Sequence, residues 1–144
     1  MDTSFHYLLL AAQGMFQRRI LARLAGSGLT AGQPKVLNYL GLHNGSVQKN
    51  IALGCQIDPA TLTGLLGRME EKGLVERRAE GGDRRALHVY LTDFGWEKQR
   101  EVLRVLEACD REMLSGLNEA EGAALLRGLR HVCEHLAENK EALQ

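Results

Sequence analysis

A short arginine-rich segment between residues 77 and 85 holds the side chains that are best suited to bind an anion. In it four arginines outnumber two acidic residues, although the formal net charge of the whole chain is zero. A guanidinium group pairs in a bidentate way with phosphate, and it enters the narrow minor groove of DNA, where the potential is most negative. We therefore expect this segment to contact a nucleic acid through Arg77, Arg78, Asp83, Arg84 and Arg85.

Arg85 is the strongest candidate among these side chains. It follows a pair of glycines that signals a turn, so it is expected near the tip of a hairpin. Asp83 is placed to hold the loop or to orient Arg85. We expect Arg84 to lie beside a phosphate, and Arg77 and Arg78 to reach phosphates from the preceding strand. The alternative for each arginine is a solvated surface charge, which contributes little to stability.

A second group of side chains could read bases directly. Thr61 and Thr63 carry hydroxyl groups that hydrogen-bond to base edges and methyl groups that contact the methyl of thymine. Arg68, further along the same segment, is expected to face phosphate. Gln48 and Lys49 begin an earlier segment and are also expected to meet phosphate.

These side chains need a helix followed by a hairpin to position them, and the central part of the chain predicts both. Asp58 is a good N-cap, and Pro59 suits the first helical position. Gly73 ends the helix, because glycine enters the left-handed region without strain. Residues 74–78 and 87–91 then read as two strands. The apolar stripe of the helix consists of Leu62, Leu65, Leu66 and Met69.

The rest of the chain reads as amphipathic helices. Ser46 is expected to cap a short helix at 47–53, and residues 54–57 are expected to turn into the central helix, which gives a helix-turn-helix pattern. The other helices are expected near residues 5–24, 93–114 and 119–138, with one more that is capped at Thr30 and continues to Leu42. Wide apolar stripes on the outer helices of a small protein favour a partner subunit.

The central motifs resemble a known family. The run LTGLLGRMEEKGLVERR is followed by GGDRRALHVYLTDFG, in which Asp83-Arg84-Arg85 precedes Leu91-Thr92 and then Gly95. This pattern is similar to the wing signature of the MarR family of bacterial transcription regulators. The chain departs from the family at Gly64, where an arginine is common, and at Gln56, where the turn glycine usually falls.

The resemblance implies a mostly α fold with a small β-hairpin wing. Residues 30–92 would form the winged helix-turn-helix DNA-binding domain, and 1–29 with 93–144 the helical dimerisation region. It implies a homodimer that represses transcription from a pseudo-palindromic operator in double-stranded DNA. It also implies a small-molecule effector bound between the dimerisation helices and the winged domain. By composition, the candidate pocket residues are Met15, Phe16, Tyr39 and Trp96.

Other classes of function have little support in the sequence. We find no catalytic triad, phosphate loop or paired-carboxylate motif, so we expect neither an enzyme nor a cofactor. His131 and His135 share a helix face but lack a third ligand, so no metal site is expected. Three widely spaced cysteines, no signal-peptide pattern and no membrane-length apolar run favour a cytoplasmic protein. Two alternatives stay open: a winged protein-interaction module without specific DNA binding, and a metal- or redox-sensing regulator of the same fold.

Overall fold

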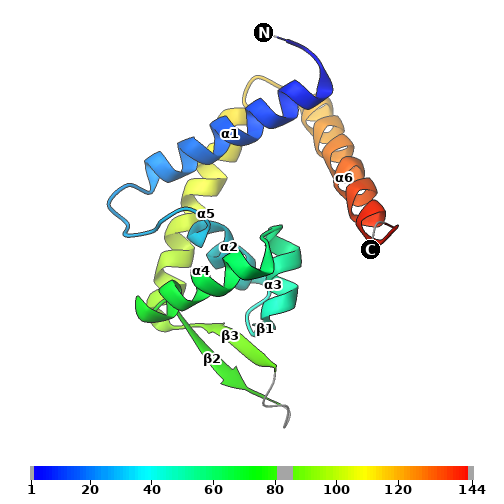
Figure 1. Ribbon diagram of the computed structural model, residues 1–144. Coiled ribbons are helices and arrows are strands. Elements are labelled where there is room, and N and C mark those ends of the chain that lie inside the picture. The colour runs from blue at the N-terminus through cyan, green and yellow to red at the C-terminus, as the bar shows by residue number, and fades with distance from the viewer. Residues whose placement is uncertain (1, 81–85, 143–144) are drawn as a thin grey trace. The chain divides into compact units, whose positions relative to one another are not determined.

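The computed structural model describes residues 2–80 and 86–142 of the chain, with side chains up to residue 138. The protein is mostly helical with a small antiparallel sheet, as the sequence predicts (Figure 1). The elements are α1 (Phe5–Arg23), α2 (Gln33–Leu42), β1 (Ser46–Val47), α3 (Gln48–Cys55), α4 (Pro59–Glu71), β2 (Val75–Ala79), β3 (Leu87–Leu91), α5 (Asp93–Leu114) and α6 (Glu119–Ala142).

Helix α4 begins and ends where its sequence requires. The Asp58 carboxylate accepts a hydrogen bond of 3.1 Å from the Thr61 N–H, and Pro59 is the first helical residue. Gly73 follows the helix with a φ of 75°, a conformation in which a side chain would be strained. The predicted apolar stripe is fully buried or nearly so, which fixes the other face of α4 toward solvent.

The sheet has the strand order β1-β3-β2, and both pairings are antiparallel. β2 and β3 form the predicted hairpin, with Val75 opposite Leu91 and Ala79 opposite Leu87. The pairing of Ser46 and Val47 with β3 is not foreseen by the sequence pattern. The expectation that Ser46 caps the next helix is wrong, because α3 begins one residue after Val47. A strand of two residues carries no alternation in its sequence, so no pattern could reveal it.

Thr92 and Gly95 join the hairpin to α5. The Thr92 hydroxyl accepts a hydrogen bond of 2.9 Å from the Gly95 N–H, so it caps the helix. A Cβ atom on Gly95 would lie 2.0 Å from the backbone oxygen of Leu74. Only glycine therefore allows α5 to start this close to the backbone that leads into β2.

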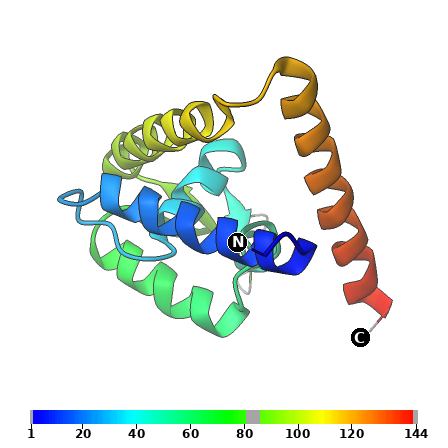
Figure 2. The same cartoon turned by 90° about the horizontal axis from the view of Figure 1, so that it is seen from above.

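The core of the first part of the chain lies among α2, α3, α4, the sheet and α5. Figures 1 and 2 show α2, α3 and α4 gathered on one side of the sheet. The buried apolar cluster consists of Leu24, Val36, Leu37, Leu40, Ile51, Ala52, Cys55, Leu62, Leu65, Leu66, Met69, Leu74, Val75, Val89, Leu91 and Val102. This core holds the outer faces of α3 and α4 in fixed positions relative to the hairpin.

The chain divides into two compact units, one up to residue 107 and one from residue 108 onward. Helix α1, in the first unit, has no buried residue, and its exposed apolar side chains include Phe5, Leu8, Leu10 and Met15. Helix α6, in the second unit, exposes Leu125, Leu126, Leu129 and Leu136. No helix in the described ranges is both long and apolar enough to cross a membrane.

Candidate nucleic-acid interface

Helices α3 and α4 are joined by a tight turn at Gln56. Gln56 has a φ of 54° and a ψ of 45°, which is a left-handed conformation. Within the described part of the chain, every other residue with a positive φ is a glycine. The Ile57 N–H donates to the Ala52 carbonyl at 3.0 Å across the turn. Gln56 thus occupies the turn position itself, and Gly54 lies inside α3.

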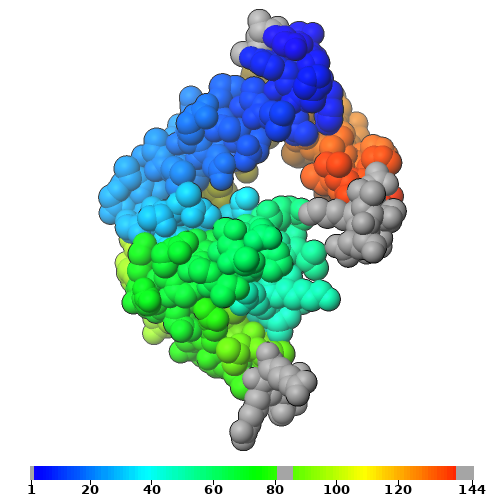
Figure 3. All heavy atoms as spheres, in the orientation of Figure 1, coloured from blue at the N-terminus to red at the C-terminus, as the bar shows by residue number. Residues whose placement is uncertain are grey.

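The outer faces of α3 and α4 lie side by side on the surface of the protein (Figure 3). From α3, Gln48 is half-exposed and Lys49 is exposed. From α4, Thr61, Thr63 and Arg68 are all exposed. All five predicted helix residues are therefore at least partly exposed; Gln48 lies against Thr63, whereas Thr61 and Arg68, seven residues apart, share another edge of α4 beside its buried stripe.

A hydrogen bond joins these two helices at the surface. The side-chain nitrogen of Gln48 lies 2.6 Å from the hydroxyl oxygen of Thr63 and donates to it. The same hydroxyl donates to the backbone carbonyl of Pro59 at 3.0 Å. The Thr63 hydroxyl is thus used both as acceptor and as donor within the protein.

Thr61 and Arg68 are held less firmly. The Thr61 hydroxyl lies 3.4 Å from the Asp58 carboxylate, at the long end of the hydrogen-bond range. A Cβ atom on Gly64 would lie 3.4 Å from a guanidinium nitrogen of Arg68, so Arg68 extends back along α4 over Gly64. The family commonly has an arginine at the position of Gly64. In this chain the guanidinium group of Arg68 lies next to that position instead.

The two arginines of β2 differ in their surroundings. Arg77 is half-buried, and its Nε lies 3.3 Å from a carboxylate oxygen of Glu70 without the alignment of a hydrogen bond. Arg78 donates to Glu76 at 3.0 Å, and its guanidinium lies over the ring of Tyr90, 4.4 Å from the centroid. Arg77 ties the wing to α4, whereas Arg78 is exposed on the wing surface.

The predicted wing tip lies outside the described residues. β2 and β3 pair out to Ala79 and Leu87, and the connection between them contains Asp83, Arg84 and Arg85. Their contact with DNA stays a prediction from the sequence.

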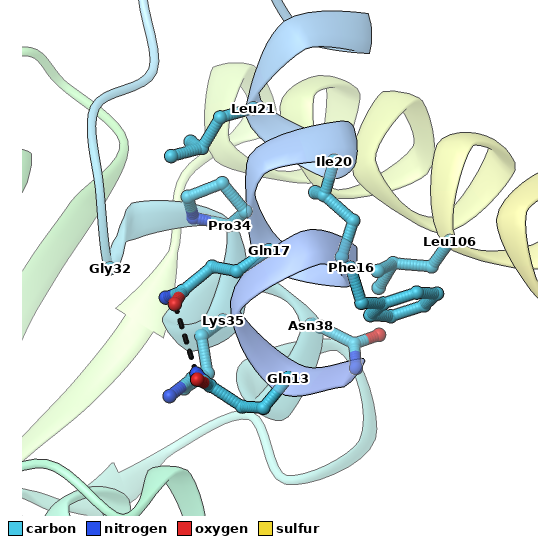
Figure 4. A pocket seen from close by; sticks show the side chains of 10 residues that line it. All are labelled: Gln13, Phe16, Gln17, Ile20, Leu21, Gly32, Pro34, Lys35, Asn38 and Leu106. Carbon is cyan, nitrogen blue, oxygen red and sulfur yellow. Dashed lines mark hydrogen bonds between the residues drawn. The ribbon is translucent and has the colours of Figure 1, made fainter. Parts of the chain in front are cut away.

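A pocket of about 280 Å³ lies among α1, α2 and α5 (Figure 4). Phe16 lines it, but the other predicted pocket residues, Met15, Tyr39 and Trp96, do not. Met15 is half-exposed to solvent, while Tyr39 and Trp96 pack against the core. The lining residues are Gln13, Phe16, Gln17, Ile20, Leu21, Gly32, Pro34, Lys35, Asn38 and Leu106.

The polar part of this pocket was missed by sequence reasoning, which considered aromatic residues. Gln13 donates to Gln17 at 3.0 Å, and Lys35 and Asn38 add a cation and a second amide to the lining. Gln13 and Gln17 are four residues apart, and so share a helix face. That spacing was the available signal.

The cysteines and histidines provide little basis for a sensor. Burial raises the pKa of the Cys55 thiol to about 11, so the thiol stays protonated near neutral pH. Cys109 is buried and Cys133 is exposed. The rings of His131 and His135 stack with centroids 6.5 Å apart. Among the described residues, no group of three or more His, Cys, Asp or Glu side chains is placed to hold a metal ion.

The geometry defines the class of protein. Two helices joined by a tight turn, a polar outer face on the second helix and a hairpin directly after it make a winged helix-turn-helix. The model of the MarR family matches residues 27–86, which include α2, α3, α4 and β2 and end before β3. The HTH-type transcriptional repressor MdtR of Bacillus subtilis (strain 168) is 33% identical over 115 residues, which span 78% of this chain and 74% of that protein. The chain belongs to the MarR family and is a DNA-binding transcriptional regulator.

Solved structures agree with this assignment. The transcriptional repressor CouR, bound to a 23-mer DNA duplex, has a TM-score of 0.81 at 26% identity and covers 90% of this chain and 92% of its own. Bordetella bronchiseptica BpsR, whose DNA binding is regulated by 6-hydroxynicotinic acid, has a TM-score of 0.78 at 26% identity, covering 92% of this chain and 95% of its own.

Proposed function

We propose that this protein is a homodimeric repressor that binds a pseudo-palindromic operator and is released by a small molecule. The observation that carries the proposal is the exposed surface of α3 and α4, where Gln48 is hydrogen-bonded to Thr63 and where Lys49, Thr61 and Arg68 are exposed. A helix with short polar side chains and a cation on its outer face suits the major groove. The repressor MdtR and the DNA complex of CouR support the same reading.

The proposed contacts divide into bases and phosphates. Thr61 and Thr63 lie in the first turns of α4, the part of a recognition helix that faces base edges. Arg68 of α4 and Lys49 of α3 are exposed cations, and we assign both to contacts with phosphate. The sequence places Gln48 at phosphate as well. Arg78 lies on the exposed wing surface and is assigned to the flanking backbone, while Arg85 is assigned to the minor groove.

The proposed dimer rests on the apolar surfaces of α1 and α6. Phe5 and Leu10 of α1 are 61% and 69% exposed, and Leu126 and Leu136 of α6 are 57% and 58% exposed in the single chain. Exposed apolar surface of this kind marks a protein interface. A second copy of the chain, related by a two-fold axis, would cover these surfaces and place two α4 helices about 34 Å apart, one turn of DNA.

The pocket among α1, α2 and α5 is the proposed effector site. It combines apolar walls from Phe16, Ile20 and Leu106 with the polar ends of Gln13 and Lys35 (Figure 4). Such a lining holds a small ligand with a polar or anionic group. Because a ligand shifts an equilibrium only by its differential affinity, it must bind more tightly to the form that has left DNA.

The test is selection of binding sites from a pool of random duplexes, for the wild type and Arg85→Ala, at about 50 and 200 mM salt. We expect the wild type to enrich an inverted repeat. Arg85→Ala should weaken binding by about 1–3 kcal/mol, the scale of one good groove contact. Arg104→Ala, which removes the same charge from an exposed position of α5, is the matched control and should bind as the wild type does. Absence of both enrichment and salt dependence would refute the proposal.

A further inference from the structure

The bond between Gln48 and Thr63 joins two helices at the surface proposed to face DNA. Gln48 is the first residue of α3, and Thr63 lies in the second turn of α4, 15 residues later. The nitrogen-to-oxygen distance is 2.6 Å, which is short for an amide donor. Neither side chain is buried. The remaining polar atoms of Gln48 and the methyl group of Thr63 therefore lie close together and are open to solvent.

The hydroxyl of Thr63 has little capacity left for a base. Its hydrogen is donated to the Pro59 carbonyl at 3.0 Å, and it accepts the amide hydrogen of Gln48. A hydroxyl has one donor, so Thr63 cannot donate to a base while the Pro59 bond is kept. The part of Thr63 that stays available is its methyl group, and an apolar contact of that kind recognises the methyl of thymine.

The amide of Gln48 keeps a donor and an acceptor. A side-chain amide carries two N–H donors and one oxygen, and the bond to Thr63 uses one donor. Within the described part of the chain the structure gives the Gln48 amide no other hydrogen bond. The free oxygen and the second N–H match the N6 amino group and the N7 acceptor of adenine, which Gln reads in a bidentate way in the major groove.

We infer that Gln48 and Thr63 act as one base-reading unit, in which Gln48 recognises an adenine and Thr63 both holds Gln48 and contacts a thymine methyl. This inference rests on the proposed DNA-binding function. It replaces the phosphate contact expected for Gln48, because an amide fixed by a second helix has a defined direction. Such an amide carries no charge, so it contributes nothing to the release of counterions from phosphate.

The first test exchanges the pattern that Gln48 presents. The carboxylate introduced by Gln48→Glu has the same shape as the amide but only acceptors, so the Thr63 hydroxyl must donate to it in place of the Pro59 carbonyl to hold it. The variant then loses the donor to adenine N7 and matches the N4 amino group of cytosine. In selections from random duplexes with the full chain, we expect adenine at one position of each half-site for the wild type. Gln48→Glu should change that position toward cytosine, by on the order of 10-fold in relative affinity, and leave the other positions as they are.

The second test separates the two roles of Thr63. Thr63→Val keeps the methyl group and replaces the hydroxyl by a second methyl group, which removes the acceptor, so the adenine preference attributed to Gln48 should fall. Thr63→Ser keeps the acceptor, so that preference should stay. Duplexes with deoxyuridine in place of only the one thymidine assigned to Thr63 lack that methyl group, and they should bind the wild type several-fold more weakly. Thr63→Ser should show no such difference.

Lys49→Ala is the matched control from the neighbouring position. It removes an exposed charge, and should therefore weaken binding to all sequences alike and reduce the salt dependence. If Gln48→Glu and Gln48→Ala instead weaken binding to all sequences alike and leave the sequence profile unchanged, Gln48 is not a base-reading residue. That result would overturn the inference but leave the proposed function standing. If the wild type enriches no sequence, both are overturned. Circular dichroism melts of each variant establish that it is folded.

Discussion

Gly54 and Tyr39 are in such close contact that a Cβ atom on Gly54 would lie 2.1 Å from Cε2 of the Tyr39 ring. This contact sets the distance between α2 and α3, and so the position of the α3 surface that holds Gln48 and Lys49. The glycine is therefore needed for helix packing, while the turn that follows it is made by Gln56.

Gly54→Ala should destabilise the protein by about 1–3 kcal/mol, the usual effect of overpacking a close contact. A matched control is Gly67→Ala in α4, where a Cβ atom would meet no atom within 4 Å. That change should stabilise the protein by about 1 kcal/mol, because alanine is the better helix former. Chemical denaturation of both variants measures the difference. Equal effects at the two positions would contradict the packing role of Gly54.

Gln56 stores backbone strain that glycine would relieve. Its φ of 54° costs an L-residue about 1–2 kcal/mol. Gln56→Gly loses a side-chain hydrogen bond to the Leu53 carbonyl but removes this strain, so we expect a net gain of about 0.5–1 kcal/mol. Gln56→Ala loses the bond and keeps the strain, and should be less stable than the wild type. If Gln56→Gly is less stable than Gln56→Ala, the turn geometry described for this residue is wrong.

The buried Cys55 thiol makes the stability depend on pH in the alkaline range. Burial raises the pKa of this thiol from 9.0 to about 11 in the folded protein. Above pH 9.0 the unfolded state releases the thiol proton while the folded state still holds it, so the free energy of unfolding falls as the pH rises. The contribution of Cys55 to the free energy of unfolding is thus fully present below pH 9.0 and is lost between pH 9.0 and about 11.

Cys55→Ala should remove this part of the pH dependence, which is on the order of 1–3 kcal/mol. Denaturant titrations of the wild type and the variant at several pH values measure it. The buried Cys55 should react with a thiol reagent only as fast as the protein opens. Rapid modification of Cys55 at neutral pH would contradict its assignment as a core residue.

Most of the interface scaffold follows from local sequence signals. The cap at Asp58, the stripe that includes Leu62 and Leu66, and the alternation in 87–91 each act over a few residues, so α4 and β3 could be predicted with their boundaries, whereas β2 begins and ends one residue later than the expected 74–78. β1 could not be predicted from the sequence, because its pairing with β3 is set by tertiary packing. The bond from Gln48 to Thr63 also joins residues that are distant in sequence, and no local pattern indicates it.

The pocket shows the same limit. Phe16 could be predicted to line it from residue type alone, whereas Tyr39 fills the contact with Gly54 and Trp96 packs on the core. Lys35 and Asn38 enter the pocket because α2 lies beside α1, which the spacing within either helix does not determine. The family resemblance supplied the fold and the function, and the structure supplied the neighbours of each side chain.

The most direct test compares the affinity of the wild-type protein for two duplexes. One is the selected inverted repeat, and the other is the same duplex with half a helical turn, about 5 base pairs, inserted between the half-sites. We expect the insertion to weaken binding more than about 10-fold, since it turns one half-site away from a rigid dimer with two α4 helices one DNA turn apart. We also expect the log of the affinity for the original repeat to fall linearly with the log of the salt concentration. Equal affinity for the two duplexes would contradict a dimeric reader of paired half-sites.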